Sequence, residues 1–400
     1  MSIDVVVYGA TGLVGGRACT ELDAAGVSFA LAGRDARALD QLGTLFPTAG
    51  KRVASLAQPE ALARAFDGAR VVLNCAGPIA DLGEPVLVAA LAAGAHYVDT
   101  GGDQAFLHAM YERHESTARR AGLACVQGCA VNGALGDLAA AWAAQHLCDA
   151  RDPADAAPLR EAPAPRLAEA EPLESSGSAG ARGNAPHGGG PIDELAVSFV
   201  FDDLVLSPAS QRAVFAHLSA RGLAWRRDRW EVVAPARERR RVNAGGAFGG
   251  EREVVSFPGG EVLTLPRHVA ARAVQTFVST TRSAAATTAL RLLARALPLV
   301  PRRASELLAP YKPDDDEYAR TRFAVIGQAR RGFSTAQVAV TGSDIYRTTA
   351  VVAAWVARQL LTRATASPLG MLAPGELFRP EPALRELARL AGLALEPSFG

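Results

Sequence analysis

Three glycines near the start of the chain have a spacing that suits phosphate binding. Gly9, Gly12 and Gly15 follow the apolar run from Ile3 to Tyr8, in the stretch YGATGLVGG. Glycines at a strand-to-helix turn permit a tight bend and let backbone N–H groups approach a pyrophosphate at the helix N-terminus. No Lys-Ser or Lys-Thr follows, which excludes a nucleoside-triphosphatase loop. The residues expected to contact a dinucleotide here are Gly9, Ala10, Thr11, Gly12, Leu13 and Val14.

The end of the second expected strand, Ser28 to Ala32, carries a cation where an NAD site carries an acid. Gly33 and Arg34 stand at that position. A guanidinium there matches a 2′-phosphate, so NADP is favoured over NAD, and Arg37 is a candidate for a second contact. The alternative is that Arg34 is merely solvated and Asp35 merely caps the next helix.

Two further turns are expected at the same edge of the sheet. The sequence NCAGP ends the fourth strand, and its small residues let a nicotinamide ribose lie close. Tyr97 and Asp99 end the fifth strand. Asp99 either orients the nicotinamide or a substrate nitrogen, or it caps the turn that follows, and both alternatives stay open. The cofactor contacts expected at this edge are Cys75, Ala76, Gly77, Pro78 and Asp99.

A histidine in the second half of the chain is a further candidate for proton transfer. Arg267 and His268 follow Leu265-Pro266 at an expected strand end, where they could meet a carboxylate or shuttle a proton. A structural role for His268 is the alternative. The candidate catalytic residues are therefore Asp99, Tyr97 and His268. No metal site is expected, because Cys125 and Cys129 have no second cysteine pair or clustered histidines to complete one.

A parallel sheet is needed to bring the first set of residues together. Over the first 140 residues, strand-like runs alternate with helical patterns, as a Rossmann-type doubly wound parallel sheet requires. The fold class predicted is α/β, with a second α+β domain inserted before the C-terminal helices. The six expected strands are Ile3 to Tyr8, Ser28 to Ala32, Arg52 to Leu56, Arg70 to Cys75, His96 to Asp99 and Leu123 to Gln127.

The rest of the chain changes character. Residues 149–191 are rich in Ala, Pro, Gly and charge, which indicates an exposed loop. Beyond them, Pro258-Gly259-Gly260 before Glu261 to Leu265 predicts a hairpin, and a helix is expected near Ala284 to Leu308. The expected domains are 1–140 for the dinucleotide, 141–192 as a low-complexity linker or insertion, 193–342 for substrate binding or dimerisation, and 343–400 as helices returning to the first domain.

Composition limits the class of protein. With 400 residues, 49% of them hydrophobic, and a net charge of +1, the chain is expected to form two domains and to bind no nucleic acid. An apolar stretch at 284–300 is interrupted by Arg291, Arg295 and Pro298, so no membrane span is expected. The chain starts as a strand rather than a signal peptide, and a cytoplasmic location is expected. Seven arginines between Arg226 and Arg241 form either a surface for an anionic substrate or carrier, or a solvated loop.

Several motifs together resemble the saccharopine dehydrogenase-like reductases, a family that includes trans-acting enoyl reductases. They are GATGLVGG at 9–16, AGR at 32–34, NCAGP at 74–78, HYVDTGGD at 96–103, TGSDIYRTTA at 341–350 and LAPGELF at 372–378. The chain departs from the family pattern at Gly102-Asp103, where the family writes Gly-Glu, and before Asp137, where it lacks the usual Pro-Ser.

The resemblance implies an NADPH-dependent oxidoreductase that transfers hydride to a C=N or C=C bond of a small or carrier-bound substrate. A trans-acting enoyl reductase on an acyl chain and an NADP-binding regulatory module without turnover are the alternatives, and homodimerisation is left open. Short-chain dehydrogenase chemistry is disfavoured, because neither Lys51 nor Lys312 has a tyrosine four positions before it.

Overall fold

The first sheet is parallel throughout and carries the glycine turn. The computed structural model describes residues 3–149, 191–279, 291–292, 313–362 and 368–400. The strands of this sheet are β1 (Ile3–Tyr8), β2 (Phe29–Gly33), β3 (Gly50–Val53), β4 (Ala69–Asn74), β5 (His96–Asp99), β6 (Ala124–Val126) and β15 (Gly370–Leu372). Their order is β15-β6-β5-β4-β1-β2-β3, and every pairing is parallel. The predicted Rossmann-type doubly wound sheet is confirmed.

Strand β1 shows why both faces of this sheet must be covered. Val5 and Val7 enter one buried core and Val6 and Tyr8 enter another, because successive side chains of a strand point to opposite faces. The helices that connect the strands are α1 (Leu13–Ala24), α2 (Ala36–Gly43), α3 (Pro59–Phe66), α4 (Ile79–Ala92) and α5 (Gln104–Arg120). The stretch from Val5 to Tyr8, which is buried at every position, therefore forms part of a central strand.

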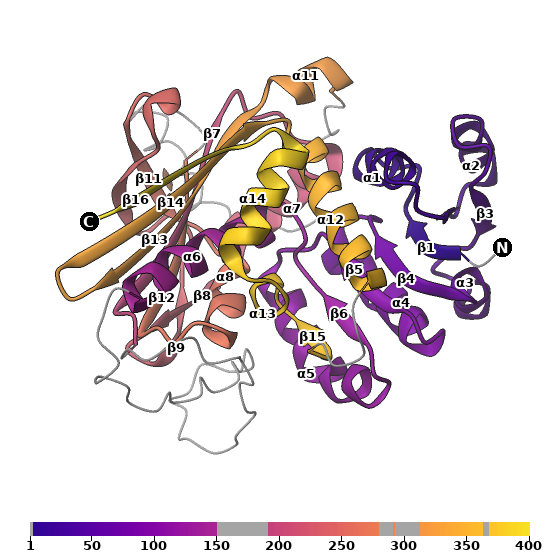
Figure 1. Cartoon of the computed structure of the whole chain (residues 1–400), viewed down its shortest axis with the longest axis horizontal. Helices are drawn as coiled ribbons and strands as arrows, with labels where there is room; N and C mark the ends of the chain where they lie inside the picture. Colours follow the sequence, from indigo (N-terminus) through magenta and orange to yellow (C-terminus); the bar gives the residue numbers. More distant parts are fainter. Residues whose placement is uncertain (1–2, 150–190, 280–290, 293–312, 363–367) are drawn as a thin grey trace.

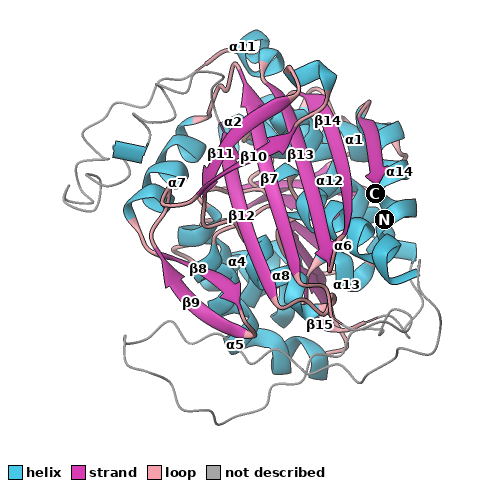
Figure 2. Cartoon of the chain, turned by 90° about the vertical axis from the view of Figure 1, so that its left-hand side faces the viewer, coloured by secondary structure: helices cyan, strands magenta, loops and turns pink. Residues whose placement is uncertain are grey.

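The second sheet is mixed and has nine strands, seven of them along its main path. Its members in chain order are β7 (Glu194–Asp202), β10 (Arg239–Asn243), β11 (Glu251–Ser256), β12 (Ala273–Ser279), β13 (Arg322–Arg331), β14 (Ser334–Ser343) and β16 (Ala394–Phe399), with β8 (Gly222–Arg226) and β9 (Arg229–Val233) attached beside β12. Figure 2 shows the long strands β7, β13 and β14 side by side.

Three helices fill the space between the two sheets (Figure 1). They are α6 (Gly136–Asp149), α12 (Ile345–Thr362) and α14 (Pro380–Ala391), with α12 against α1 and α6 against β13. Gly327 on β13 has no side chain where the α6 backbone passes, so the helix packs directly on the strand. The single core that results joins both sheets.

The C-terminal segment contributes to both sheets. Strand β15 pairs with β6 in the first sheet, so that sheet has seven strands where six were expected. Strand β16 pairs instead with β14 in the second sheet. The last part of the chain therefore ties the two sheets together.

One expected hairpin is wrong. Glu261 to Leu265 forms the helix α8 (Glu261–Thr264) and the start of a 3₁₀ turn (Leu265–Arg267), and the N–H groups of Leu263 and Thr264 donate to the carbonyl of Gly260. A short apolar run that is buried on all sides has the same pattern in a strand and in a helical turn.

Helix α6 continues to Asp149, inside the expected linker. Residues 150–190 and, apart from 291–292, the expected helix at 284–308 lie outside the described residues.

Candidate functional site

The glycine turn is closely packed on its inner side and open on its outer side. Gly9 has a φ of +80°, and a Cβ there would lie 2.6 Å from the backbone nitrogen of Ala76. A Cβ on Gly15 would overlap the carbonyl oxygen of Gly9. Thr11 and Gly12 are exposed, and Gly12 caps α1 without a side-chain hydrogen bond. The first N–H groups of α1, which have no partner within a helix, are therefore free of side-chain caps and acidic neighbours.

Arg34 lies at the end of the strand next to the glycine turn. It directly follows β2, its side chain is exposed, and within the described part of the chain it makes no hydrogen bond or ion pair. Burial raises the pKa of the Tyr8 hydroxyl, and the positive charge of Arg34 acts to lower it. Asp35 caps α2 by accepting from the N–H of Ala38 at 3.0 Å, a feature that the alternative interpretation of this stretch also expects. Arg37 is also exposed, in the first turn of α2.

Polar side chains behind the β4 turn are bonded to one another. The Asn74 carboxamide oxygen accepts from the N–H of Ala76 at 3.0 Å, and its Nδ2 donates to the Tyr97 hydroxyl at 3.0 Å. Cys75, Ala76, Gly77 and Pro78 then lie partly or fully exposed at the carboxyl edge of the sheet. This is the edge where open α/β folds bind their ligands.

Asp99 is enclosed and joins two turns. It is 0% exposed, and its Oδ1 accepts from the N–H groups of Gly101 at 2.9 Å and Gly128 at 3.2 Å. Burial raises the pKa of its carboxyl to about 6, although these N–H groups and the hydrogen bonds of Tyr97 and Gln127 act to lower it. Of the two alternatives for Asp99, capping of the turn is the one that the structure shows.

Tyr97 is 0% exposed as well, and burial raises the pKa of its hydroxyl well above the usual value. Neither side chain is on the open edge of the sheet, where both were expected. The loop after β6 is bonded to Asp99 through the N–H of Gly128, and Tyr97 is packed in the core on one face of the sheet. A direct catalytic role for Tyr97 or Asp99 stays a prediction.

Helix α7 (Pro208–Ser219) of the second domain lies over this edge. Near its N-terminus, the Ala209 Cβ is 3.8 Å from the position that a Cβ on Gly77 would take. Near its C-terminus, the Nε2 of His217 is 3.3 Å from Oδ2 of Asp103. Because Gly77 follows β4 and Asp103 follows β5, α7 spans both turns and covers the site from the side of the second domain. The place of this helix over the sheet edge could not be predicted from the sequence.

The comparisons with known proteins agree with this geometry. Residues 5–126 match the saccharopine dehydrogenase NADP binding domain. The first domain of the chain is therefore similar to the NADP-binding domain of the saccharopine dehydrogenases. The predicted resemblance is thus confirmed. The matched segment carries the glycine turn, Arg34 and the turns after β4 and β5.

The whole chain also has the fold of a solved member of this family. It is similar to apo saccharopine dehydrogenase (L-Glu forming) from Saccharomyces cerevisiae, with a TM-score of 0.59 and 13% identity, over 100% of each chain. At that identity the likeness concerns the fold alone.

One curated relative is closer in sequence but matches less of the chain. It is a lipid droplet localized protein of Caenorhabditis elegans, 33% identical over 147 residues. The match covers 34% of this chain and 34% of the relative, so the chain spans about a third of the length of that protein.

His268 lies in a buried cluster that the sequence did not reveal. Its Nε2 is 3.0 Å from Oδ2 of Asp137, which is 0% exposed at the start of α6. Asp137 also accepts from the Thr264 hydroxyl at 2.6 Å and from the N–H of Gly375 at 2.8 Å. The only signal for Asp137 was its place in the family motif, where the chain lacks the usual Pro-Ser.

A second ion pair lies next to this cluster. Arg267 contacts both carboxylate oxygens of Glu376, at 2.7 and 3.3 Å, and donates to the carbonyl of Met371 at 2.8 Å. Its guanidinium lies 4.2 Å from the centre of the Tyr111 ring. Together the two pairs hold the segment after β15 against α5, α6 and the turn after α8.

Glu261, on α8, is buried beside Asp137 and adds no charge to it. Burial, with the Asp137 charge as a smaller cause, raises the pKa of its carboxyl to about 8, so the group is mostly protonated at neutral pH. Two adjacent buried carboxylates would repel each other, and one neutral partner avoids that cost. The charge of Asp137 is then available to His268.

The stability of this cluster is expected to depend on pH. Burial disfavours the charged imidazole, but the charge and hydrogen bond of Asp137, aided by Glu376 and opposed by Arg267, outweigh it and raise the pKa of His268 above its ordinary 6.5. A group whose pKa rises on folding stabilises the fold below its unfolded pKa, and this is lost as the pH passes its folded value.

We therefore expect His268→Gln to be less stable than the wild-type protein at about pH 6, with the difference shrinking toward about pH 9. Urea unfolding across that range measures it. A difference that is the same at every pH would show that folding does not change the pKa of His268. The proposed role of His268 in proton transfer stays a prediction.

The arginine-rich stretch is largely neutralised by acidic partners. Five of its seven arginines are in ion pairs with glutamates of the second domain. The pairs are Arg226–Glu238, Arg229–Glu231, Arg239–Glu253, Arg240–Glu194 and Arg241–Glu251. Trp225 is buried and donates to the carbonyl of Ala271 at 2.7 Å. The stretch therefore presents less free positive charge than its composition indicates.

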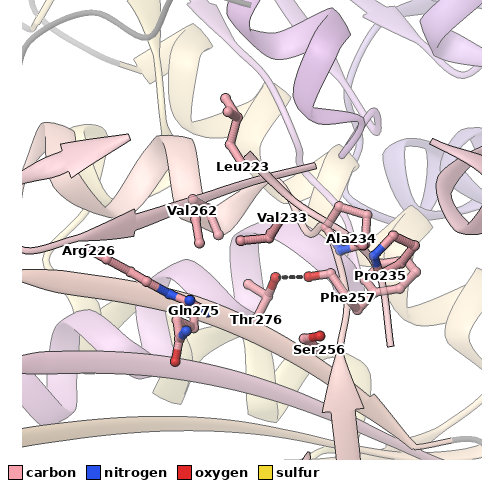
Figure 3. A pocket seen from close by; sticks show the side chains of 12 residues that line it. Leu223, Arg226, Val233, Ala234, Pro235, Ser256, Phe257, Val262, Gln275 and Thr276 are labelled. Atoms are coloured by element: carbon pink, nitrogen blue, oxygen red, sulfur yellow. Dashed lines mark hydrogen bonds between the residues drawn. The ribbon is translucent and has the colours of Figure 1, made fainter. Parts of the chain in front are cut away.

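A small pocket lies between β8, β11 and β12 (Figure 3), near Arg226 and Gln275. The Thr276 hydroxyl donates to the carbonyl of Phe257 in its wall. Its volume of about 20 Å³ holds a single water molecule and no substrate.

In the described part of the chain, no group of three or more His, Cys, Asp or Glu is placed to hold a metal ion. None of the described helices combines the length and hydropathy needed to cross a bilayer.

Proposed function

We propose that this protein is an NADPH-dependent oxidoreductase that transfers hydride to a C=N or C=C bond. The observation that carries the proposal is Arg34, an exposed cation without a partner in the described chain, at the end of the strand next to the glycine turn. An arginine there pairs with the 2′-phosphate that distinguishes NADP from NAD.

The order of the strands supports one direction for the cofactor. Arg34 follows β2 on one side of β1, whereas the turns after β4 and β5 lie on the other side. With the pyrophosphate at the N-terminus of α1, the adenosine half would lie toward Arg34 and the nicotinamide half toward Ala76 and Gly77. When bound, the cofactor supplies the hydride.

The remaining residues would enclose the reacting groups. Helix α7 lies over the β4 and β5 turns, where it would limit access of water to the nicotinamide ring. Asp99, held inside the fold, would keep the two turns beneath the ring in place. We assign proton transfer to His268, whose pKa Asp137 raises against the effect of burial.

For the substrate, one observation favours an acyl chain. The worm relative is a lipid droplet localized protein, which suits a trans-acting enoyl reductase on a fatty acyl or polyketide substrate better than a reductase of small imines. By the same reasoning, a lipid droplet surface is an alternative to the expected cytoplasmic location. An NADP-binding module without turnover is the second alternative.

Two measurements test the proposal. NADPH should bind at least about tenfold more tightly than NADH, as one charge-assisted phosphate contact implies, in a fluorescence titration. Oxidation of NADPH is then followed with a panel of imines and enoyl thioesters. Equal affinities for the two cofactors would refute the NADP assignment, and tight NADPH binding without turnover of any substrate class would favour the regulatory module.

A further inference from the structure

A single exposed residue stands out in the longest buried stretch of the chain. From Leu123 to Ala144 every residue is buried except Asn132, which is exposed. It belongs to the loop between β6 and α6, at the carboxyl edge of the first sheet. Polar residues held outward on such loops are more often used for binding than for stability.

The conformation of the loop is what turns Asn132 outward. The N–H groups of Ala130 and Ala134 both donate to the carbonyl of Gly128, at 2.8 Å each. The chain between Ala130 and Ala134 therefore forms a tight bend. Gly133 has a φ of +139°, and a Cβ there would overlap the same carbonyl. Asn132 itself has φ −88° and ψ 98°, outside the helical region that flanks it.

Asn132 leans over the neighbouring turn. A Cβ on Gly102 would lie 3.2 Å from the Asn132 carbonyl oxygen and 3.5 Å from its Nδ2, so Asn132 sits against the turn after β5. Asp99 locks this arrangement, because its Oδ1 accepts from both Gly101 and Gly128 and its carbonyl accepts from Cys129 at 2.8 Å. The position of Asn132 is therefore rigid.

The side-chain amide of Asn132 is available to a ligand. Within the described chain it makes no hydrogen bond. Neighbouring strands are about 4.8 Å apart, so the β5 turn lies about 10 Å from the glycine turn after β1, on the side opposite Arg34. In the proposed orientation of NADP, that is where the nicotinamide ring would lie.

We propose that Asn132 binds the carboxamide of the nicotinamide ring and so fixes the orientation of the ring. A primary amide offers N–H donors and a carbonyl acceptor, and the carboxamide offers the same groups in return, so the two can pair reciprocally. This inference rests on the proposed NADP site. Asp99 is then a positioning residue for Asn132.

The test compares ligands that differ at the carboxamide. NADPH carries it, the reduced 3-acetylpyridine analogue of NADP keeps the carbonyl but loses the NH₂ group, and adenosine 2′,5′-bisphosphate lacks the whole nicotinamide half. Wild-type protein should bind NADPH about five- to tenfold more tightly than the acetylpyridine analogue. Asn132→Ala should abolish that preference by weakening NADPH more than the analogue, which loses only the bond to its carbonyl, and leave affinity for the bisphosphate unchanged.

The outcomes distinguish a failure of this inference from a failure of the proposed NADP site. If Asn132→Ala keeps the wild-type preference, or loses bisphosphate affinity in parallel, Asn132 does not bind the carboxamide. If wild-type protein fails to bind the bisphosphate, the NADP site itself is wrong. Asn243→Ala, at an exposed asparagine on β10 in the second sheet, is the control and should alter none of the three affinities. An unchanged melting temperature of Asn132→Ala shows that the loop still folds.

Discussion

Replacing Arg34 by alanine is expected to weaken NADPH binding about ten- to a hundredfold, the effect of losing a hydrogen bond between charged groups. NADH, which lacks the 2′-phosphate, should bind almost as it does to the wild-type protein. Because Arg34 makes no hydrogen bond or ion pair within the described residues, its removal leaves no partner unsatisfied, and folding should be unaffected. Fluorescence titration with both cofactors measures the change.

A substitution that reverses the charge of Arg34 gives a stricter test. Arg34→Asp should repel the phosphate and offer a carboxylate to the ribose hydroxyls, so the preference should invert or come close to it. Arg37→Ala, three residues further on in α2, is the matched control and should have the smaller effect. If Arg34→Ala weakens both cofactors equally, Arg34 supports the turn rather than the phosphate. If neither cofactor weakens, the phosphate is bound elsewhere.

A methyl group on Gly15 is expected to destabilise the fold by roughly 3 kcal/mol, the upper end of what overpacking usually costs. Its Cβ would overlap the Gly9 carbonyl oxygen and lie 2.8 Å from the carbonyl carbon. Both atoms belong to the backbone of the turn, which cannot yield without moving β1 or α1. Gly15→Ala should therefore unfold at a lower urea concentration and lose NADPH affinity.

The next residue provides a control in the same helix. A Cβ on Gly16 would lie 3.5 Å from the Ala10 carbonyl oxygen, which is ordinary contact. Alanine is preferred to glycine inside a helix by about 0.5 to 1 kcal/mol, so Gly16→Ala should be neutral or slightly stabilising. Equal destabilisation by the two substitutions would mean that α1 does not pack on the turn as closely as the structure has it.

Asp99 illustrates a limit on reading chemistry from residue type and place in the chain. An acid at the end of a strand, on the edge where ligands bind, is a candidate for catalysis, and for Asp99 that role stays a prediction. In the structure its carboxylate is buried, and its Oδ1 accepts from the N–H groups of Gly101 and Gly128. The loop that covers it begins 28 residues later in the chain, at Gln127. No pattern in the residues around Asp99 could indicate that this loop would cover it.

His268 shows the same limit from the other direction. The sequence marked it as a residue that could meet a carboxylate, but the partner, Asp137, is 131 positions away. The segment that carries it was expected to be a strand and is a helix followed by a 3₁₀ turn. The pairing depends on α6, α8 and the residues after β15 coming together, which is a property of the packed core.

By itself the sequence determined the nucleotide half of this protein. A strand buried on both faces, a glycine turn, a helix and the arginine after the next strand lie within the first 34 residues, and each is specified by local periodicity or by the backbone freedom of glycine. The tertiary structure decided which polar side chains a ligand can reach. It encloses Tyr97 and Asp99, turns Asn132 outward and places α7 over the site, because exposure depends on how segments distant in the chain pack against one another.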